Sequence, residues 1–280
     1  MERRCLLGVF AHPDDEIGMA GAFRRYHDEG VMTALVCATR GEVGEISDPA
    51  LATPETLGQV REQELRAACR IMGVEELSFL DYVDGQLADA DTLEAVGRIV
   101  RHIRRLRPQV VVTFGPNGGY GHRDHIAIHH YTKAAFQQAG DPQAYSEQLA
   151  DGLRPYAPLK LYYTAYPRNL MRRMLEQAMS AQPDFNPFGN VATIPLEEMG
   201  TADEEITTEL PLDDALYAVR TQASEAHRTQ QNPNGPFARL APEAVRAVWG
   251  SQQFVRAVPP VAVPDGSERD LFAGVALAGS

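Results

Sequence analysis

The chain has 280 residues, and 26 Lys and Arg against 38 Asp and Glu give it a formal net charge of −12 at pH 7. Hydrophobic residues make up 44% and charged residues 23%, which is typical of a globular protein with a substantial core and excludes a disordered chain. The acidic balance argues against general binding to nucleic acid or to an anionic membrane. The densest basic run, residues 101–107, has the spacing of a solvated helix face.

Three features bear on the compartment. The apolar run at residues 5–11 is too short for a signal peptide and breaks at a His-Pro-Asp-Asp sequence. No stretch approaches the roughly 18 apolar residues of a membrane helix. The cysteines Cys5, Cys37 and Cys69 are odd in number and lie mostly in apolar surroundings, as reduced core residues do. We therefore expect a soluble cytoplasmic protein.

The first half of the chain alternates between strand and helix patterns. Uninterrupted apolar runs, typical of strands covered on both faces, lie at residues 5–11, 32–38, 77–80 and 109–114. Helical patterns follow them at residues 15–29, 61–73, 92–107 and 122–139. This alternation predicts an α/β fold, with a Rossmann-like, doubly wound, mostly parallel sheet and helices on both faces.

The pattern weakens after residue 140. We expect strands at residues 160–165, 205–210 and 251–257, and helices at residues 168–181 and 212–228. The proline-containing stretch 182–200 is an irregular excursion, a candidate for a pocket lid or an oligomer contact. No linker divides the chain, so we expect one domain over residues 1–280. In it, residues 1–140 form the Rossmann-like core with the metal site, and residues 141–280 complete the sheet and wall the pocket.

Two of the expected strands end in clusters of chemically active side chains. The first runs into Ala-His-Pro-Asp-Asp-Glu at residues 11–16, and the fourth is followed by Gly-Gly-Tyr-Gly-His-Arg-Asp-His at residues 118–125. Open parallel sheets bind ligands at the carboxyl ends of their strands. Each cluster alone would be interpreted as a helix start with capping residues. Their joint position favours a site where histidine and carboxylate hold a metal and leave room for a hydrolytic water.

These clusters also resemble a known family. Together with Thr-Arg-Gly-Glu at residues 39–42 and, more weakly, the segment 223–230, they look like the LmbE/PIG-L family of metal-dependent N-acetylglucosaminyl deacetylases. That family includes deacetylases of mycothiol and bacillithiol biosynthesis and mycothiol-conjugate amidases. The resemblance implies that His12, Asp15 and His125 bind one divalent metal, zinc or alternatively ferrous iron.

The resemblance also implies catalytic roles. Asp14 becomes the general base for the attacking water, and His122 stabilises the oxyanion or protonates the leaving amine. Tyr120 matches a loop tyrosine that reaches the scissile carbonyl, and Asp124 could orient a neighbouring histidine. Arg123 stands where many relatives carry proline, which changes loop stiffness but removes no ligand. Amide hydrolysis needs such groups, and a carboxylate beside the metal and a histidinium can supply them.

The candidates for substrate binding lie near the same ends of the expected strands. Arg40 and Glu42 follow the second strand, Asp81 and Asp84 follow the third, and Arg61, the favoured candidate, opens the helix after the long loop. Arg61 resembles a family arginine that binds sugar hydroxyls or an anion. For each of these residues, a surface ion pair or a loop cap is the alternative. We expect His129 to pack on its helix, and leave open whether His227 lines the pocket.

We therefore predict a metal-dependent hydrolase that removes the N-acetyl group from an N-acetylglucosamine conjugate, such as GlcNAc-malate or GlcNAc-inositol. Alternatives with the same metal chemistry are an amidase of thiol S-conjugates and a chitobiose-type deacetylase. A non-catalytic sugar- or nucleotide-binding module would not need both intact clusters, and an inactive paralogue would be expected to lose a ligand. The expected partner is a small amino-sugar conjugate. The sequence does not determine whether the chain forms a homo-oligomer.

Overall fold

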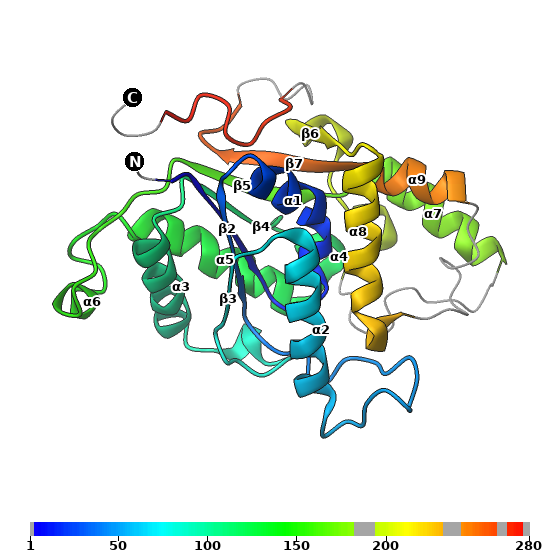
Figure 1. Cartoon of the computed structure of the whole chain (residues 1–280), viewed down its shortest axis with the longest axis horizontal. Coiled ribbons are helices and arrows are strands. Elements are labelled where there is room, and N and C mark those ends of the chain that lie inside the picture. Colours follow the sequence, from blue (N-terminus) through cyan, green and yellow to red (C-terminus); the bar gives the residue numbers. More distant parts are fainter. Residues whose placement is uncertain (1–2, 182–193, 232–241, 262–267, 277–280) are drawn as a thin grey trace.

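A computed structural model of the chain describes residues 3–181, 194–231, 242–261 and 268–276. A seven-stranded sheet runs through them in the order β3-β2-β1-β4-β5-β7-β6 (Figure 1). Its strands are β1 (Cys5–Phe10), β2 (Met32–Cys37), β3 (Glu76–Phe79), β4 (Val110–Phe114), β5 (Lys160–Ala165), β6 (Thr208–Pro211) and β7 (Ser251–Val258). Strands β1 to β5 pair in parallel, and β7 pairs antiparallel with β5 and β6. The predicted doubly wound, mostly parallel sheet is confirmed.

Helices cover both faces of this sheet. They are α1 (Ala20–Asp28), α2 (Leu57–Met72), α3 (Thr92–Leu106), α4 (Gly118–Gly121), α5 (Arg123–Gln138), α6 (Glu147–Ala150), α7 (Arg168–Ala181), α8 (Asp214–Ala226) and α9 (Pro242–Trp249). Helices α1, α2 and α8 pack together on one face, and α3 packs with α5 on the other (Figure 1). Every residue of β1 and β4 is buried between these layers, which explains their unbroken apolar sequences.

The element boundaries follow local chemistry. The carboxylate of Asp91 accepts a hydrogen bond from the Glu94 amide at 2.9 Å and thereby caps the start of α3. Gly73, with φ of 77°, ends α2 in the left-handed conformation that glycine adopts without a steric penalty. Both ends lie within a residue or two of where the sequence predicts them.

The structure differs from the expected elements in several places, including the short helix α4 where a glycine-rich loop was expected. The helix expected over residues 15–29 starts as a 3-10 helix, η1 (Asp15–Met19), and becomes α-helical at Ala20. The strand expected at residues 205–210 begins later, because a 3-10 turn occupies Asp203–Glu205. Helices α6 and α9 were not expected. Most of the excursion 182–200 lies outside the described residues, which resume at residue 194.

Two expectations about compartment can be compared with the fold. Cys5, Cys37 and Cys69 are all buried and unpaired by disulfides, as expected for reduced core residues. Within the described part of the chain, no helix has the length and apolar character needed to cross a membrane.

Candidate active site

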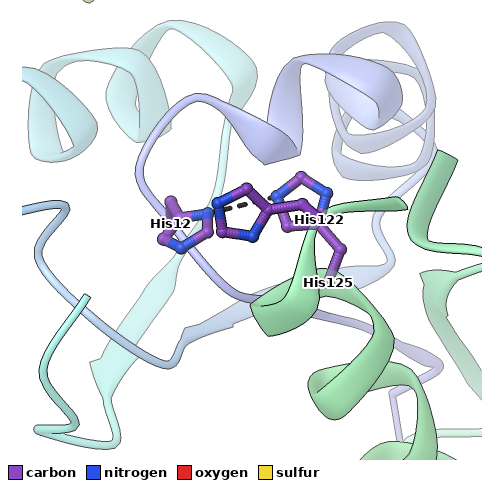
Figure 2. Close-up of side chains that lie close together, drawn as sticks. All are labelled: His12, His122 and His125. Carbon is purple, nitrogen blue, oxygen red and sulfur yellow. Dashed lines mark hydrogen bonds between the residues drawn. The ribbon is translucent and has the colours of Figure 1, made fainter. Parts of the chain in front are cut away.

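The two sequence clusters meet at the carboxyl ends of β1 and β4, which are neighbours in the sheet. The ring centroid of His12, in the loop after β1, lies 4.8 Å from that of His122 and 5.1 Å from that of His125. His122 and His125 come from the start of α5. Figure 2 shows the three imidazoles gathered in one place. The fold therefore joins residues more than a hundred positions apart into one site.

Three side chains place ligand atoms around a common point. His12 Nδ1 lies 3.1 Å from His125 Nε2. The Asp15 carboxylate completes the set, with Oδ2 3.6 Å from His12 Nδ1 and Oδ1 3.3 Å from His125 Nε2. Burial alone would raise the pKa of Asp15, but the two histidines hold it well below its usual range. Asp15 is therefore an ionised carboxylate beside two imidazole nitrogens.

The outer nitrogens of both imidazoles have acceptors of their own. His12 Nε2 lies 3.0 Å from Asp84 Oδ1 and 3.4 Å from Asp124 Oδ2, and His125 Nδ1 lies 3.0 Å from the Gly118 carbonyl oxygen. These contacts place protons on the outer nitrogens and turn a lone pair of each ring toward Asp15. Two imidazole nitrogens and one carboxylate make a donor set that suits a divalent metal with one position left open.

Hydrogen bonds to carboxylates also affect the charge of His12. Burial lowers the pKa of His12, but its contacts with Asp124, Asp15 and Asp84 outweigh burial and raise this pKa well above the usual value. A metal bound at Nδ1 would therefore take the place of a proton.

His122 offers a hydrogen-bond donor beside the predicted ligands. Its Nδ1 accepts the Asp124 amide at 3.2 Å and caps α5, which leaves the proton of the neutral ring on Nε2. Burial and the charges of His125 and His12 lower the pKa of His122 to about 4. The ring nitrogens of the three histidines still lie within 4.8 Å of one another. The histidinium expected from the sequence is thus replaced by a neutral imidazole that offers an N–H.

Asp14 is held in a strained position next to the ligands. Its φ of 96° is in the left-handed region, which is uncommon for a residue with a side chain. Its carboxylate is 38% exposed and lies 3.1 Å from Arg61 Nη2. Although part of the side chain reaches solvent, the surrounding protein desolvates the carboxyl group and, opposed by the Arg61 charge, raises the pKa of Asp14 to about 6. At neutral pH this group is ionised and close to the pKa that suits a general base.

Arg61 does not present a free guanidinium to solvent. It is buried, and besides Asp14 it donates to the carbonyl oxygens of Pro13 at 2.5 Å and Gly41 at 3.0 Å. Gly41 leaves room for it, because a Cβ there would lie 2.2 Å from Arg61 Nη1. The predicted substrate-binding arginine therefore braces the loops that follow β1 and β2.

The other predicted substrate residues lie in protein contacts. Arg40 pairs with Glu62 at 2.6 Å and Asp81 at 2.7 Å, so it forms the surface ion pair considered as its alternative. Glu42 accepts the Asp84 amide at 3.2 Å, and Asp84 itself holds His12. These contacts position the loops around the site.

The predicted positioning and loop residues also have defined surroundings. Asp124 is fully buried and accepts the Gly85 amide at 2.7 Å, so that it orients His12 rather than a neighbour in sequence. The Tyr120 ring centroid lies 5.2 Å from that of His125. Burial raises the pKa of Tyr120, which keeps its phenol protonated and able to donate. The structure thus brings Tyr120, His122 and the ligands together.

Sequence reasoning missed one buried pair. Glu16 and His227 are each 1% exposed, and Glu16 Oε1 lies 2.7 Å from His227 Nε2. Acidic residues are common in the first turn of a helix, so nothing in the sequence assigned Glu16 a role at the site. His227 lies in the C-terminal segment that resembles the family, which was the only pointer to it. His129, by contrast, packs as expected, with Nδ1 2.8 Å from the Phe114 carbonyl oxygen.

A cavity adjoins the site beyond Tyr166. It lies between β5, α7, α8 and α9 and has apolar walls that include Leu170, Met174 and Trp249. The Arg220 guanidinium lies over the Trp249 ring, 4.3 Å from its centroid. A Cβ on Gly18 would lie 2.8 Å from the Tyr166 hydroxyl, so this tyrosine stands against the segment that carries Asp14 and Asp15.

Comparisons with known proteins show the family of this chain. A family profile described as PIG-L, GlcNAc-PI de-N-acetylase, matches residues 7–136. The 1D-myo-inositol 2-acetamido-2-deoxy-alpha-D-glucopyranoside deacetylase of Thermobispora bispora is 37% identical over 98% of this chain and all of its own length. The mycothiol S-conjugate amidase of Streptomyces coelicolor is 33% identical over 96% of this chain and 97% of its own.

Solved structures share the fold. The N,N'-diacetylchitobiose deacetylase from Pyrococcus horikoshii superposes with a TM-score of 0.67 at 20% identity, covering 91% of this chain and 84% of that one. The protein TT1542 from Thermus thermophilus superposes with a TM-score of 0.61 at 29% identity, covering 92% and 97%.

Proposed function

The chain belongs to the PIG-L family of N-deacetylases, and we propose that it is a metal-dependent hydrolase that removes the N-acetyl group from a small N-acetylglucosamine conjugate. The observation that carries this proposal is geometric: His12 Nδ1, His125 Nε2 and the Asp15 carboxylate face one point. The Asp14 carboxylate, adjacent in sequence, lies 3.1 Å from Arg61 Nη2. A binding module would need neither the ligand set nor the base.

His12, Asp15 and His125 would hold the metal. We propose zinc, with ferrous iron as the alternative, because histidine and carboxylate ligands suit both ions. When bound, such a metal supplies an activated water and polarises the carbonyl of the substrate. Asp84 and Asp124 keep the His12 ring in the orientation and tautomer that binding requires.

Asp14 would take the proton from the attacking water as its oxygen bonds to the acetyl carbon. The His122 Nε2–H and the Tyr120 hydroxyl would donate to the oxygen on which charge develops. Neutral His122 is a poor acid, so the proton held by Asp14 would pass to the departing nitrogen as the carbon–nitrogen bond breaks. The products are acetate and the free amine of the glucosamine conjugate.

Several conjugates fit this chemistry. The relatives named as inositol-glucosaminide deacetylases support GlcNAc-inositol as substrate, and GlcNAc-malate is the related candidate. The similarity to a mycothiol S-conjugate amidase supports a second candidate function, hydrolysis of the larger amide of a thiol S-conjugate. A chitobiose-type deacetylase is the remaining alternative. All are small amino-sugar conjugates.

The test is acetate and amine release from a panel of these compounds. The protein is loaded with zinc or ferrous iron and compared with a chelated sample and with Asp14→Asn. Metal-dependent acetate release from one conjugate, lost in Asp14→Asn, is the expected result. Amide cleavage of the S-conjugate alone would favour the second candidate. Absence of turnover on every member, with metal bound, would refute the proposal.

A further inference from the structure

His227 reaches the site from a distant part of the chain. It ends α8, lies outside the residues matched by the family profile, and is separated from Glu16 by 211 positions. Its Nε2 nevertheless lies 2.7 Å from Glu16 Oε1, with both side chains 1% exposed. Such a buried polar contact constrains the geometry of both partners.

Glu16 is in turn hydrogen-bonded to the backbone of Asp14. Its second carboxylate oxygen, Oε2, accepts the backbone N–H of Asp14 at 2.8 Å. Asp14 has a φ of 96°, a backbone conformation that is strained for a residue with a side chain. Glu16 thus stabilises the strained peptide from which the Asp14 carboxylate projects. Arg61 holds the same residue from the side-chain end.

The tautomer of His227 follows from its surroundings. Among the described residues, no hydrogen-bond partner lies within reach of the buried Nδ1. Burial lowers the pKa of His227, but the charge and the hydrogen bond of Glu16 outweigh burial and raise this pKa. In the neutral ring a proton on Nδ1 would be an unsatisfied buried donor, so in the neutral and the charged ring alike Nε2 carries a proton and donates to Glu16.

A nearby contact provides a comparison. Thr229, two residues further on, donates to Glu64 through its amide at 2.8 Å and its hydroxyl at 2.7 Å. These two hydrogen bonds dock the same segment against α2 and involve neither Asp14 nor Glu16. A substitution at Thr229 should therefore affect the docking of the segment, and a substitution at His227 should also affect the position of Asp14.

We propose that His227 and Glu16 are positioning residues that hold Asp14 in the conformation its catalytic role requires. This inference rests on the proposed function of Asp14 as general base. It predicts that the His227 donor matters for turnover while metal binding, which uses other side chains, does not depend on it. The relevant property is the N–H offered to Glu16, rather than the charge or the ring of the histidine.

The test compares His227→Ala, His227→Gln and Thr229→Val in the full chain. For each, metal content, thermal midpoint, kcat and KM are measured with the best substrate of the panel. His227→Ala should keep a full complement of metal and lose about 10- to 100-fold in kcat, the range for residues that orient active groups, with little change in KM. Glutamine at this position can donate to Glu16 and should restore kcat to within about three-fold of wild type. Thr229→Val should lower the thermal midpoint yet keep kcat within about three-fold.

Four results would overturn the inference. His227→Ala could keep wild-type kcat, Thr229→Val could lose as much kcat as His227→Ala, or His227→Gln could fail to restore it. Loss of metal in His227→Ala would also contradict it, since that indicates a structural role. An inactive wild-type protein would instead count against the proposed function, so the two failures are distinguishable.

Discussion

Replacing Arg61 by methionine separates a bracing role from a substrate-binding one. Arg61 is 3% exposed and donates to the carbonyl oxygens of Pro13 and Gly41 and to the Asp14 carboxylate. Methionine keeps an unbranched stem of similar length but offers no donor. Arg61→Met therefore leaves two carbonyl groups of the loops after β1 and β2 without their partner, while the packing of the stem is largely kept.

The lost contacts determine how much the free energy of unfolding should fall. A buried polar group that loses its partner costs about 1–3 kcal/mol, and two such groups predict a loss of about 3 kcal/mol in the free energy of unfolding. The contact with Asp14 adds little, because that carboxylate is 38% exposed and screened by solvent. In a chain of this size the thermal midpoint should fall by about 6 to 12 °C.

Scanning calorimetry of the metal-loaded protein measures this shift, with Arg40→Met as the matched control. Arg40 also pairs with two carboxylates, but its side chain is 31% exposed, so its loss should cost under about 1 kcal/mol. The Arg61 charge also lowers the pKa of Asp14, so Arg61→Met should move the acid limb of the pH–rate profile to higher pH. If Arg61→Met were as stable as Arg40→Met and showed only a raised KM, the bracing role would be refuted. Arg61 would then be a substrate-binding residue, as the sequence predicted.

Further predictions concern the base, the ligands and the sheet edge. Asp14→Asn should keep its metal and lose about 100-fold or more in kcat, as metal analysis and acetate release would show, because an amide cannot take the proton. In wild type the rate should fall below about pH 6, where Asp14, its pKa raised by burial, becomes protonated and ceases to act as a base; a flat profile down to about pH 4 would contradict this. His125→Ala should weaken metal binding by about 100-fold or more in equilibrium dialysis, and unchanged affinity would exclude it as a ligand. Glu268→Ala should cost about 3 kcal/mol in urea unfolding, because Lys160 at 3.2 Å and Arg256 at 2.9 Å lose their shared carboxylate; a loss below about 0.5 kcal/mol would show that the pair is dispensable.

The parallel part of the fold could be predicted from the sequence because its signals are local. Fully buried strands such as β1 and β4 have unbroken apolar runs, and the helices between them fix parallel pairing and handedness. The pairing of β7 between β5 and β6 could not be predicted, because no short connection specifies which strand a late strand will join. The 3-10 helix η1 could not be predicted either, because Asp15 and Glu16 are equally suited to the first turn of an α-helix.

In the site, too, residues in local motifs could be predicted, and residues whose roles depend on tertiary contacts could not. The ligand set lies in two compact motifs at strand ends, so their meeting follows from the topology of the sheet. The roles of Arg61 and Arg40 do not, because an arginine beside a pocket can bind substrate, brace a loop or pair at the surface, and only the surrounding carbonyls and carboxylates decide between these. The contact of Glu16 with His227 depends on how α8 packs against α1 and α2, which no local pattern encodes.

Hydrolysis of an acetamide by this chain should require a metal held by His12, Asp15 and His125. The most direct test is to add zinc or ferrous iron stepwise to metal-free protein and follow acetate release from GlcNAc-inositol. Activity should be absent at the start, rise linearly with added metal, and level off at one equivalent per chain in wild type but not in His125→Ala. Full activity before metal is added, or the same titration curve in His125→Ala, would contradict the account.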